Sequence, residues 1–111
     1  MAFEIILAPQ AVASLKNLSV PVQAGVQRAL ELHLTHEPTK VSRSRIKRLR
    51  GLSQPQYRLR VGDIRVFYDV TETQGQILAI VTRADAQAWL DEQGTPAGDK
   101  AESRSPGRDQ G

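Results

Sequence analysis

With 111 residues and a formal net charge of +3, the chain is long enough for one small domain with a single core. It has no cysteine, which excludes disulfides and any site that uses a thiol as nucleophile or metal ligand. It also has no apolar stretch as long as a membrane span and no N-terminal signal pattern, so we expect a cytoplasmic protein without membrane association.

Apolar patterns predict a strand and two helices in the N-terminal third of the chain. The run Phe3–Leu7 is typical of a short strand. Pro9 suits the first turn of a helix, and apolar residues follow it at helical spacing. A second helix is expected from Pro21 to about His36, again with one apolar face. We expect the two helices to form an antiparallel pair that covers one face of a sheet.

Three more strands and one short helix are expected in the remainder. Residues 39–56 are expected to form a polar connection between elements, and Leu49 and Leu52 are expected to attach it to the core. Strands are expected at 57–61, 64–70 and 76–82, and a helix follows from Ala84 to Gln93. These elements predict an α+β fold in which two N-terminal helices pack on a mostly antiparallel four-stranded sheet and a short C-terminal helix ends the domain.

The C-terminal segment differs in composition from the rest. From Gly94 onward the chain has no large apolar residue, so burial cannot offset the entropy lost on ordering. We therefore expect a domain of residues 1–93 followed by a disordered tail of residues 94–111.

The two central strands meet at Gly62-Asp63, a pair typical of a two-residue hairpin turn. With that turn, one face of the hairpin is apolar or aromatic and suits a core. The opposite face carries Arg58, Arg60, Arg65 and Phe67. Like charges that face each other across a sheet are destabilising, so such a gathering of arginines indicates an anion-binding function.

Positive charge is concentrated in the same region. Nine of the 15 Lys and Arg residues lie between Lys40 and Arg65, where Asp63 is the only acidic residue. Such a patch favours a polyanionic partner, with nucleic acid first. A solvated basic face and a docking surface for an acidic protein are the alternatives.

The order of these elements resembles that of the RelE/ParE superfamily, the toxins of bacterial type II toxin–antitoxin pairs. The resemblance rests on the strand, the helix pair, the basic connection, the hairpin sequence YRLRVGDIRVFY of residues 57–68, and the apolar strand that ends at Arg83. It covers residues 2–92. It implies a compact α+β domain whose concave sheet face is the working surface.

The resemblance implies two possible activities. RelE-like members cut messenger RNA in the A site of the 70S ribosome, whereas ParE-like members inhibit DNA gyrase and lack the basic catalytic set. Arg58 and Arg60 stand where RelE-like members have lysines, and Arg65 and Arg83 match family arginines. Trp89 stands where ribonuclease members have a tyrosine. A degenerate member that only binds an antitoxin or RNA is a third possibility.

These residues suit part of the chemistry of RNA cleavage. We predict Arg60, Arg65 and Arg83 as catalytic residues, because a permanently cationic planar fork matches phosphate oxygens, and each well-placed donor can be worth roughly 3–4 kcal/mol in the transition state. RNA-binding roles are predicted for Arg58, Lys47, Arg48, Arg50, Phe67 and Trp89. Arginine is a poor general base and indole is only a donor, so the groups that transfer protons are not evident. Asp85 or Glu92 are possible substitutes.

Each of these assignments has a structural alternative. Trp89 at helical spacing suits a core anchor as well as a stacking surface, and Arg83 has Asp85 and Asp69 as potential ion-pair partners. His33 and His36 are three residues apart without a third ligand, so we predict no metal site. We expect no cofactor. The expected partners are a cognate antitoxin in a hetero-oligomer, messenger RNA and the ribosomal A site.

Overall fold

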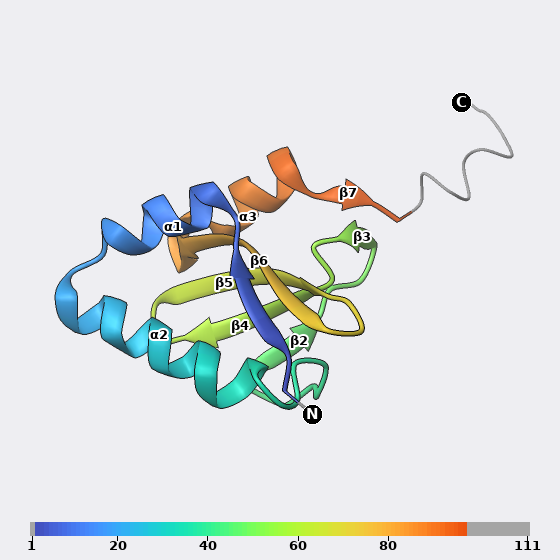
Figure 1. Ribbon diagram of the computed structural model, residues 1–111. Coiled ribbons are helices and arrows are strands. Elements are labelled where there is room, and N and C mark those ends of the chain that lie inside the picture. Colours follow the sequence, from blue (N-terminus) through green and yellow to red (C-terminus); the bar gives the residue numbers. More distant parts are fainter. Residues whose placement is uncertain (1, 98–111) are drawn as a thin grey trace, which may run out of the picture.

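The computed structural model describes residues 2–97, which form a five-stranded sheet with helices on both faces, and a small second sheet (Figure 1). The order of elements is β1 (Glu4–Leu7), α1 (Pro9–Lys16), α2 (Val20–Leu34), β2 (Ile46–Arg48), β3 (Leu52–Gln54), β4 (Tyr57–Val61), β5 (Ile64–Val70), β6 (Gln74–Thr82), α3 (Arg83–Gln93) and β7 (Thr95–Pro96). The strand order of the main sheet is β1-β6-β5-β4-β2. Only β1 and β6 run parallel; the other pairs of this sheet are antiparallel.

The α+β class and the mostly antiparallel sheet are as expected, but the predicted number of four strands is wrong. The fifth strand is β2, which lies within the segment expected to be a polar connection and pairs with β4. Its only apolar residue is Ile46, which is 4% exposed and lies opposite Leu59. β2 is therefore a strand because it pairs with the edge of β4. Its three residues are too few to show the alternation of a strand.

The second sheet alters the expected start of the tail. β3 and β7 pair antiparallel, with Leu52 opposite Pro96 and Gln54 opposite Thr95. The backbone is thus defined beyond Gly94, where we expected disorder to begin, as far as Ala97. The remainder of the predicted tail, residues 98–111, lies outside the described residues.

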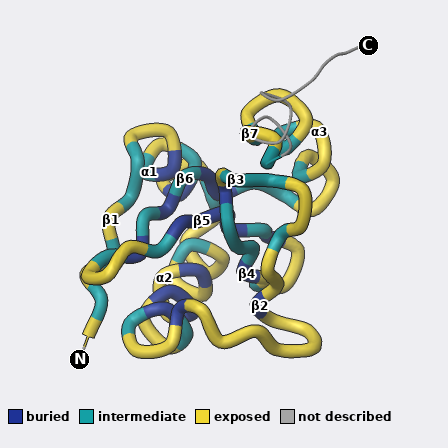
Figure 2. Tube along the Cα trace, turned by 90° about the vertical axis from the view of Figure 1, so that its right-hand side faces the viewer, coloured by how far each residue is buried: buried dark blue, intermediate teal, exposed yellow. Residues whose placement is uncertain are grey.

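The core lies between the sheet and the two N-terminal helices. α1 packs against β6, and α2 packs against β4. Both helices contribute a stripe of buried apolar residues, as their spacing predicts, and the sheet contributes alternate positions (Figure 2). The largest buried members are Leu34, Leu59, Tyr68 and Ile77. None of the helices within residues 2–97 is long and apolar enough to cross a membrane.

α3 lies on the opposite face of the sheet and none of its residues is fully buried. Its main attachment is Trp89, whose ring stacks on Phe67 of β5 with centroids 5.2 Å apart and planes at 9°. This face of the sheet is therefore only partly covered, because α3 crosses β5 and β6 and leaves much of β4 open.

Tyr68 connects the core to the loop that follows α2. Its hydroxyl donates to the carbonyl oxygen of Pro38 at 2.7 Å, and its ring stacks on Tyr57 with centroids 5.5 Å apart. Burial, and secondarily the nearby Tyr57, raises the pKa of Tyr68. The phenol is therefore a structural donor that stays protonated in the folded chain.

Tyr68→Phe is expected to lower the free energy of unfolding by about 1 kcal/mol at neutral pH. Above about pH 10 only the unfolded chain loses this proton, so wild-type stability falls by up to about 1.4 kcal/mol per pH unit from this group. The variant lacks that titration, and its deficit should shrink in urea titrations as the pH rises from about 8 to about 11. A deficit that stays constant over this range would contradict the assignment.

Candidate functional site

The β4–β5 hairpin has the register that its sequence predicts. Gly62 adopts a φ of +58° in the turn, a conformation that glycine reaches without strain. Arg60 lies opposite Arg65, and Arg58 lies opposite Phe67. Because Leu59 and Val66 point into the core, strand alternation places these three arginines together on the other face.

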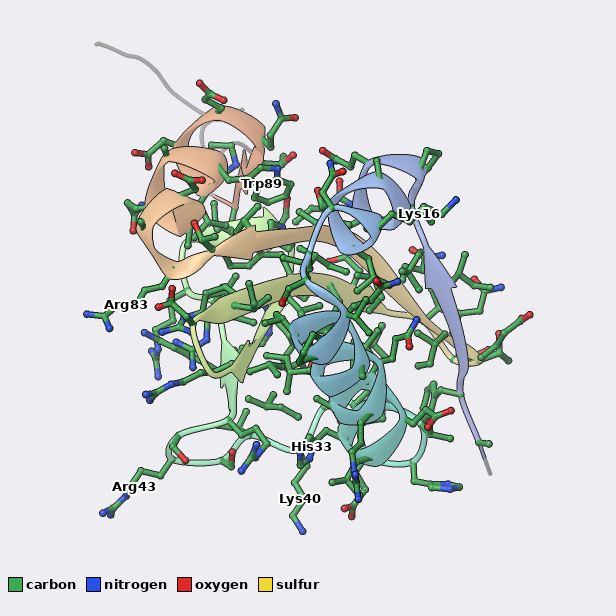
Figure 3. The ribbon with its side chains drawn as sticks, turned by 90° about the vertical axis from the view of Figure 1, so that its left-hand side faces the viewer. Lys16, His33, Lys40, Arg43, Arg83 and Trp89 are labelled. Carbon is green, nitrogen blue, oxygen red and sulfur yellow. The ribbon has the colours of Figure 1, made fainter. Side chains whose placement is uncertain are left out.

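Arg83 joins them through the backbone. Its amide donates to the carbonyl oxygen of Asp63 in the hairpin turn at 2.8 Å, so α3 begins directly beside the turn. Figure 3 shows Arg83 at this edge of the sheet, with nitrogen-bearing side chains gathered beneath it. We refer to Arg58, Arg60, Arg65 and Arg83 as the arginine cluster.

The arginines of the cluster lie close enough for their charges to affect one another. Burial, followed by Arg65 and Arg60, lowers the pKa of Arg58. Burial, followed by Arg60 and Arg83, lowers the pKa of Arg65, and Asp63 offsets only part of this. The positive charges therefore repel one another in the folded chain, and a bound anion would relieve that repulsion.

Among residues 2–97 the hydrogen-bonding groups of Arg65 and Arg58 differ in their partners. Arg65 Nη1 donates to the carbonyl oxygens of Gly62 and Ile64 at 2.9 and 3.1 Å, which fixes the guanidinium against the turn. The buried Nε of Arg58 has no hydrogen-bond partner among the described residues. One guanidinium is therefore held in place and a second has an unpaired donor, which suits the oxygens of a phosphodiester.

Arg58→Met is expected to raise the free energy of unfolding by about 1 kcal/mol, because it removes a buried donor without a partner and one of the mutually repelling charges. The gain should be larger at low salt, where repulsion is screened less. Thermal unfolding at two salt concentrations measures both effects. A destabilised variant would show that Arg58 contributes to the fold rather than to a ligand site.

The ion pairs considered as the structural alternative for Arg83 are absent from the described residues. Their one salt bridge joins Lys40 Nζ to Glu37 Oε1 at 3.7 Å. The carboxylate of Asp69 is buried and accepts instead from Gln54 Nε2 at 2.6 Å and from the amide of Gln56 at 2.7 Å. Asp69 therefore fixes the loop before β4, and Arg83 belongs to the cluster.

The basic residues of β2 divide between two environments. Lys47 lies opposite Arg58 and so extends the cluster along the same face. Arg48 donates to the carbonyl oxygen of Gln56 at 2.7 Å and lies over the ring of Tyr57, 5.2 Å from its centroid. Arg50 is exposed in the turn before β3. Arg48 is therefore held by the protein itself, whereas Lys47 and Arg50 face open surface.

The two aromatic residues of the site also differ. Phe67 is 1% exposed and its ring is covered by Trp89, so it is a core residue of this face and has no free surface for a base. Trp89 is half-buried, with one ring face on Phe67. Trp89 therefore anchors α3 to the sheet, on the same face that carries the arginine cluster.

No histidine lies in the cluster. His33 and His36 line a separate pocket at the end of α2 with Lys40, Ser42 and Arg45, and none of the cluster arginines borders it. Figure 3 shows His33 and Lys40 apart from Arg83. Burial, and secondarily Arg45, lowers the pKa of His33. Within residues 2–97 no three His, Cys, Asp or Glu side chains gather as a metal site would require.

One polar pair near the cluster was not singled out from the sequence. Gln87 Nε2 donates to Asp91 Oδ1 at 3.0 Å on the side of α3 that faces the β2–β3 turn. The spacing of four residues was the available signal, because residues i and i+4 are neighbours on a helix.

The fold of this chain matches solved structures, although its sequence matches no family model. No family model matches the sequence, and no curated relative matches it. Solved structures do match. An archaeal RelE–RelB complex from Pyrococcus horikoshii has a TM-score of 0.62 and 24% identity over 75% of this chain and 97% of the other. The toxin–antitoxin complex RelBE2 from Mycobacterium tuberculosis has a TM-score of 0.59 and 23% identity, over 75% of this chain and 100% of the other.

A third match extends the same pattern. The RelB–RelE antitoxin–toxin complex from Methanococcus jannaschii has a TM-score of 0.58 and 19% identity over 77% of this chain and 98% of the other. At these identities the likeness concerns the fold. The resemblance read from the sequence is confirmed at that level: the chain has a RelE-like fold.

Proposed function

We propose that the chain is the toxin of a type II toxin–antitoxin pair and that it inhibits translation in the cytoplasm by cutting messenger RNA in the ribosomal A site. The arginine cluster carries this proposal. Arg58, Arg60 and Arg65 share the open face of a RelE-like fold, and Arg83 begins α3 beside their turn. A phosphodiester is the ligand that their charge and planar donors suit best.

The cluster supplies electrostatic stabilisation. When the 2′-hydroxyl attacks the adjacent phosphorus, negative charge grows on the phosphorane oxygens. Arg60, Arg65 and Arg83 neutralise that charge, and the hydrogen bonds from Arg65 to its own turn hold one fork in place before substrate arrives. The mechanism uses guanidinium groups as its source of positive charge and requires no metal.

Proton transfer comes from outside the cluster. Arginine stays protonated and cannot act as a base, and the two histidines lie in a different pocket. We assign activation of the 2′-hydroxyl to groups that the ribosome and its message contribute in the A site, rather than to Asp85 or Glu92 of α3. This division makes cleavage dependent on the ribosome: the protein holds and polarises the phosphate, and isolated RNA is bound but cut poorly.

An antitoxin is the expected partner. The matched structures are complexes of RelE with RelB, and a free toxin of this kind must be neutralised. An acidic segment of the antitoxin laid over the open sheet face would meet the arginine cluster and Lys47. The resulting hetero-oligomer would be inactive because the phosphate site is covered.

Inhibition of gyrase is the rival function, since tryptophan and arginines replace the tyrosine and lysines of RelE-like members. Induced expression in cells that carry both a translation reporter and a supercoiling reporter separates the two. Prompt loss of translation with cleaved messages and unchanged supercoiling is expected. Loss of supercoiling before loss of translation would refute the proposal, and so would the absence of any effect.

A further inference from the structure

A pocket of about 400 Å³ lies between the β2–β3 turn and α3, beside the arginine cluster. Its walls come from two segments far apart in the sequence: Lys47, Leu49, Arg50 and Leu52 on one side, and Gln87, Leu90 and Asp91 on the other. Figure 2 shows α3, β3 and β7 side by side at this end of the molecule. The size suits one small planar group.

The second sheet holds the two walls together. β3 pairs with β7, which directly follows α3, and the amide of Ala97 donates to the carbonyl oxygen of Gly51 at 3.0 Å. At Gly94 a methyl group would approach Leu52 to 3.2 Å and the carbonyl oxygen of Leu90 to 2.6 Å. This close packing fixes the distance between the β2–β3 turn and α3, so the pocket is present before any ligand binds.

The lining combines apolar faces with hydrogen-bonding groups. Leu49, Leu52 and Leu90 offer the apolar surface that the face of a base requires. Asp91 is oriented by the amide of Gln87 at 3.0 Å. Among the described residues neither Lys47 nor Arg50 forms an ion pair with it, although both line the same pocket.

A carboxylate on a basic surface does not contribute to phosphate binding, because it repels the backbone. It can accept hydrogen bonds from a base edge, which is how proteins read unpaired RNA. Guanine fits the whole set. Its N1–H and N2–H₂ are adjacent donors that one carboxylate can accept together, and its O6 and N7 are acceptors for Lys47 or Arg50.

Lys47 links the pocket to the arginine cluster. Lys47 is both a wall of the pocket and the residue opposite Arg58 in the sheet. A nucleotide whose phosphate lies on the arginine cluster can therefore place its base in the pocket. Resting on the function proposed above, we propose that this pocket binds an unpaired guanine of the RNA and that Asp91 is the residue that determines its specificity.

The test is binding of short single-stranded RNAs that differ at one position, measured by fluorescence anisotropy at low salt with the full chain. The oligonucleotides carry guanine, inosine, adenine, cytosine or uracil there. Wild type is expected to prefer guanine by roughly tenfold, since one bidentate base contact is worth about that factor. Inosine lacks the 2-amino group and should lose most of the preference.

Asp91→Asn is expected to bind all five RNAs with nearly equal affinity. Glu72→Gln is the matched control, because it removes the same charge from an exposed residue of the β5–β6 turn, which does not line the pocket, and it should keep the preference. A wild type that shows no preference, while Arg65→Ala/Arg83→Ala still weakens binding, overturns the base pocket and leaves the phosphate site intact. No dependence on Arg65 and Arg83 overturns both.

Discussion

Replacing Arg65 and Arg83 together by alanine is expected to abolish growth arrest while the domain remains folded. Both residues belong to the arginine cluster, and removing one preorganised donor from a developing oxyanion typically costs about 10²–10³ in rate. The double variant should therefore cut messages at least about a hundredfold more slowly. Circular dichroism and thermal unfolding should show no loss of stability, because the change also removes like-charge repulsion.

The matched control removes two positive charges from elsewhere. Lys16→Ala/Arg28→Ala changes exposed residues of α1 and α2, outside the open sheet face, and lowers the net charge by the same amount. This variant should arrest growth as wild type does. If Arg65→Ala/Arg83→Ala remained fully toxic, the site would lie elsewhere. If both double variants lost toxicity equally, the loss would be an effect of net charge alone.

Phe67→Ala is expected to destabilise the fold by about 3–5 kcal/mol, the usual cost of deleting a buried aromatic ring. Phe67 is 1% exposed and is the surface on which Trp89 stacks, so its loss also detaches α3 from the sheet. Trp89 is the only tryptophan of the chain. Its emission in the folded variant should shift towards that of solvent-exposed indole, and urea titration gives the stability.

Leu32→Ala provides the comparison for an apolar side chain that is not buried. Leu32 is 70% exposed on α2, so its truncation should change stability by no more than about 0.5 kcal/mol. If Phe67→Ala proved as stable as wild type and instead lost affinity for RNA, the aromatic ring would be a ligand-binding surface and the assignment of Phe67 to the core would be wrong.

The hairpin illustrates what sequence determines locally. Alternation of period two and the Gly62-Asp63 pair were sufficient to place Arg58, Arg60 and Arg65 on one face in the observed register. The position of Arg83 followed from the family resemblance, and its hydrogen bond to Asp63 now gives the physical reason. The hairpin register depends on contacts between neighbours in the chain or across one turn, whereas the contact of Arg83 with Asp63 joins the two ends of the β5–β6 pair.

The features that were missed depend on tertiary contacts. β2 and β7 are too short to show a period, and each is a strand only because another segment of the chain pairs with its backbone. The burial of Phe67 required the knowledge that α3 folds back over β5. The pocket beside Asp91 exists only because β7 returns to β3, a pairing across 40 or more residues that no local pattern indicates.

In the proposed function, the arginine cluster acts on a messenger RNA phosphate in the ribosome. The most direct test adds the purified full chain to ribosomes that are translating a defined message, followed by mapping of the RNA ends. We expect cuts within the codon in the A site that leave 5′-hydroxyl ends, since attack by the 2′-hydroxyl expels the 5′-oxygen. The cuts should require the ribosome and disappear in Arg65→Ala/Arg83→Ala. Intact messages on ribosomes exposed to wild-type protein would contradict the claim.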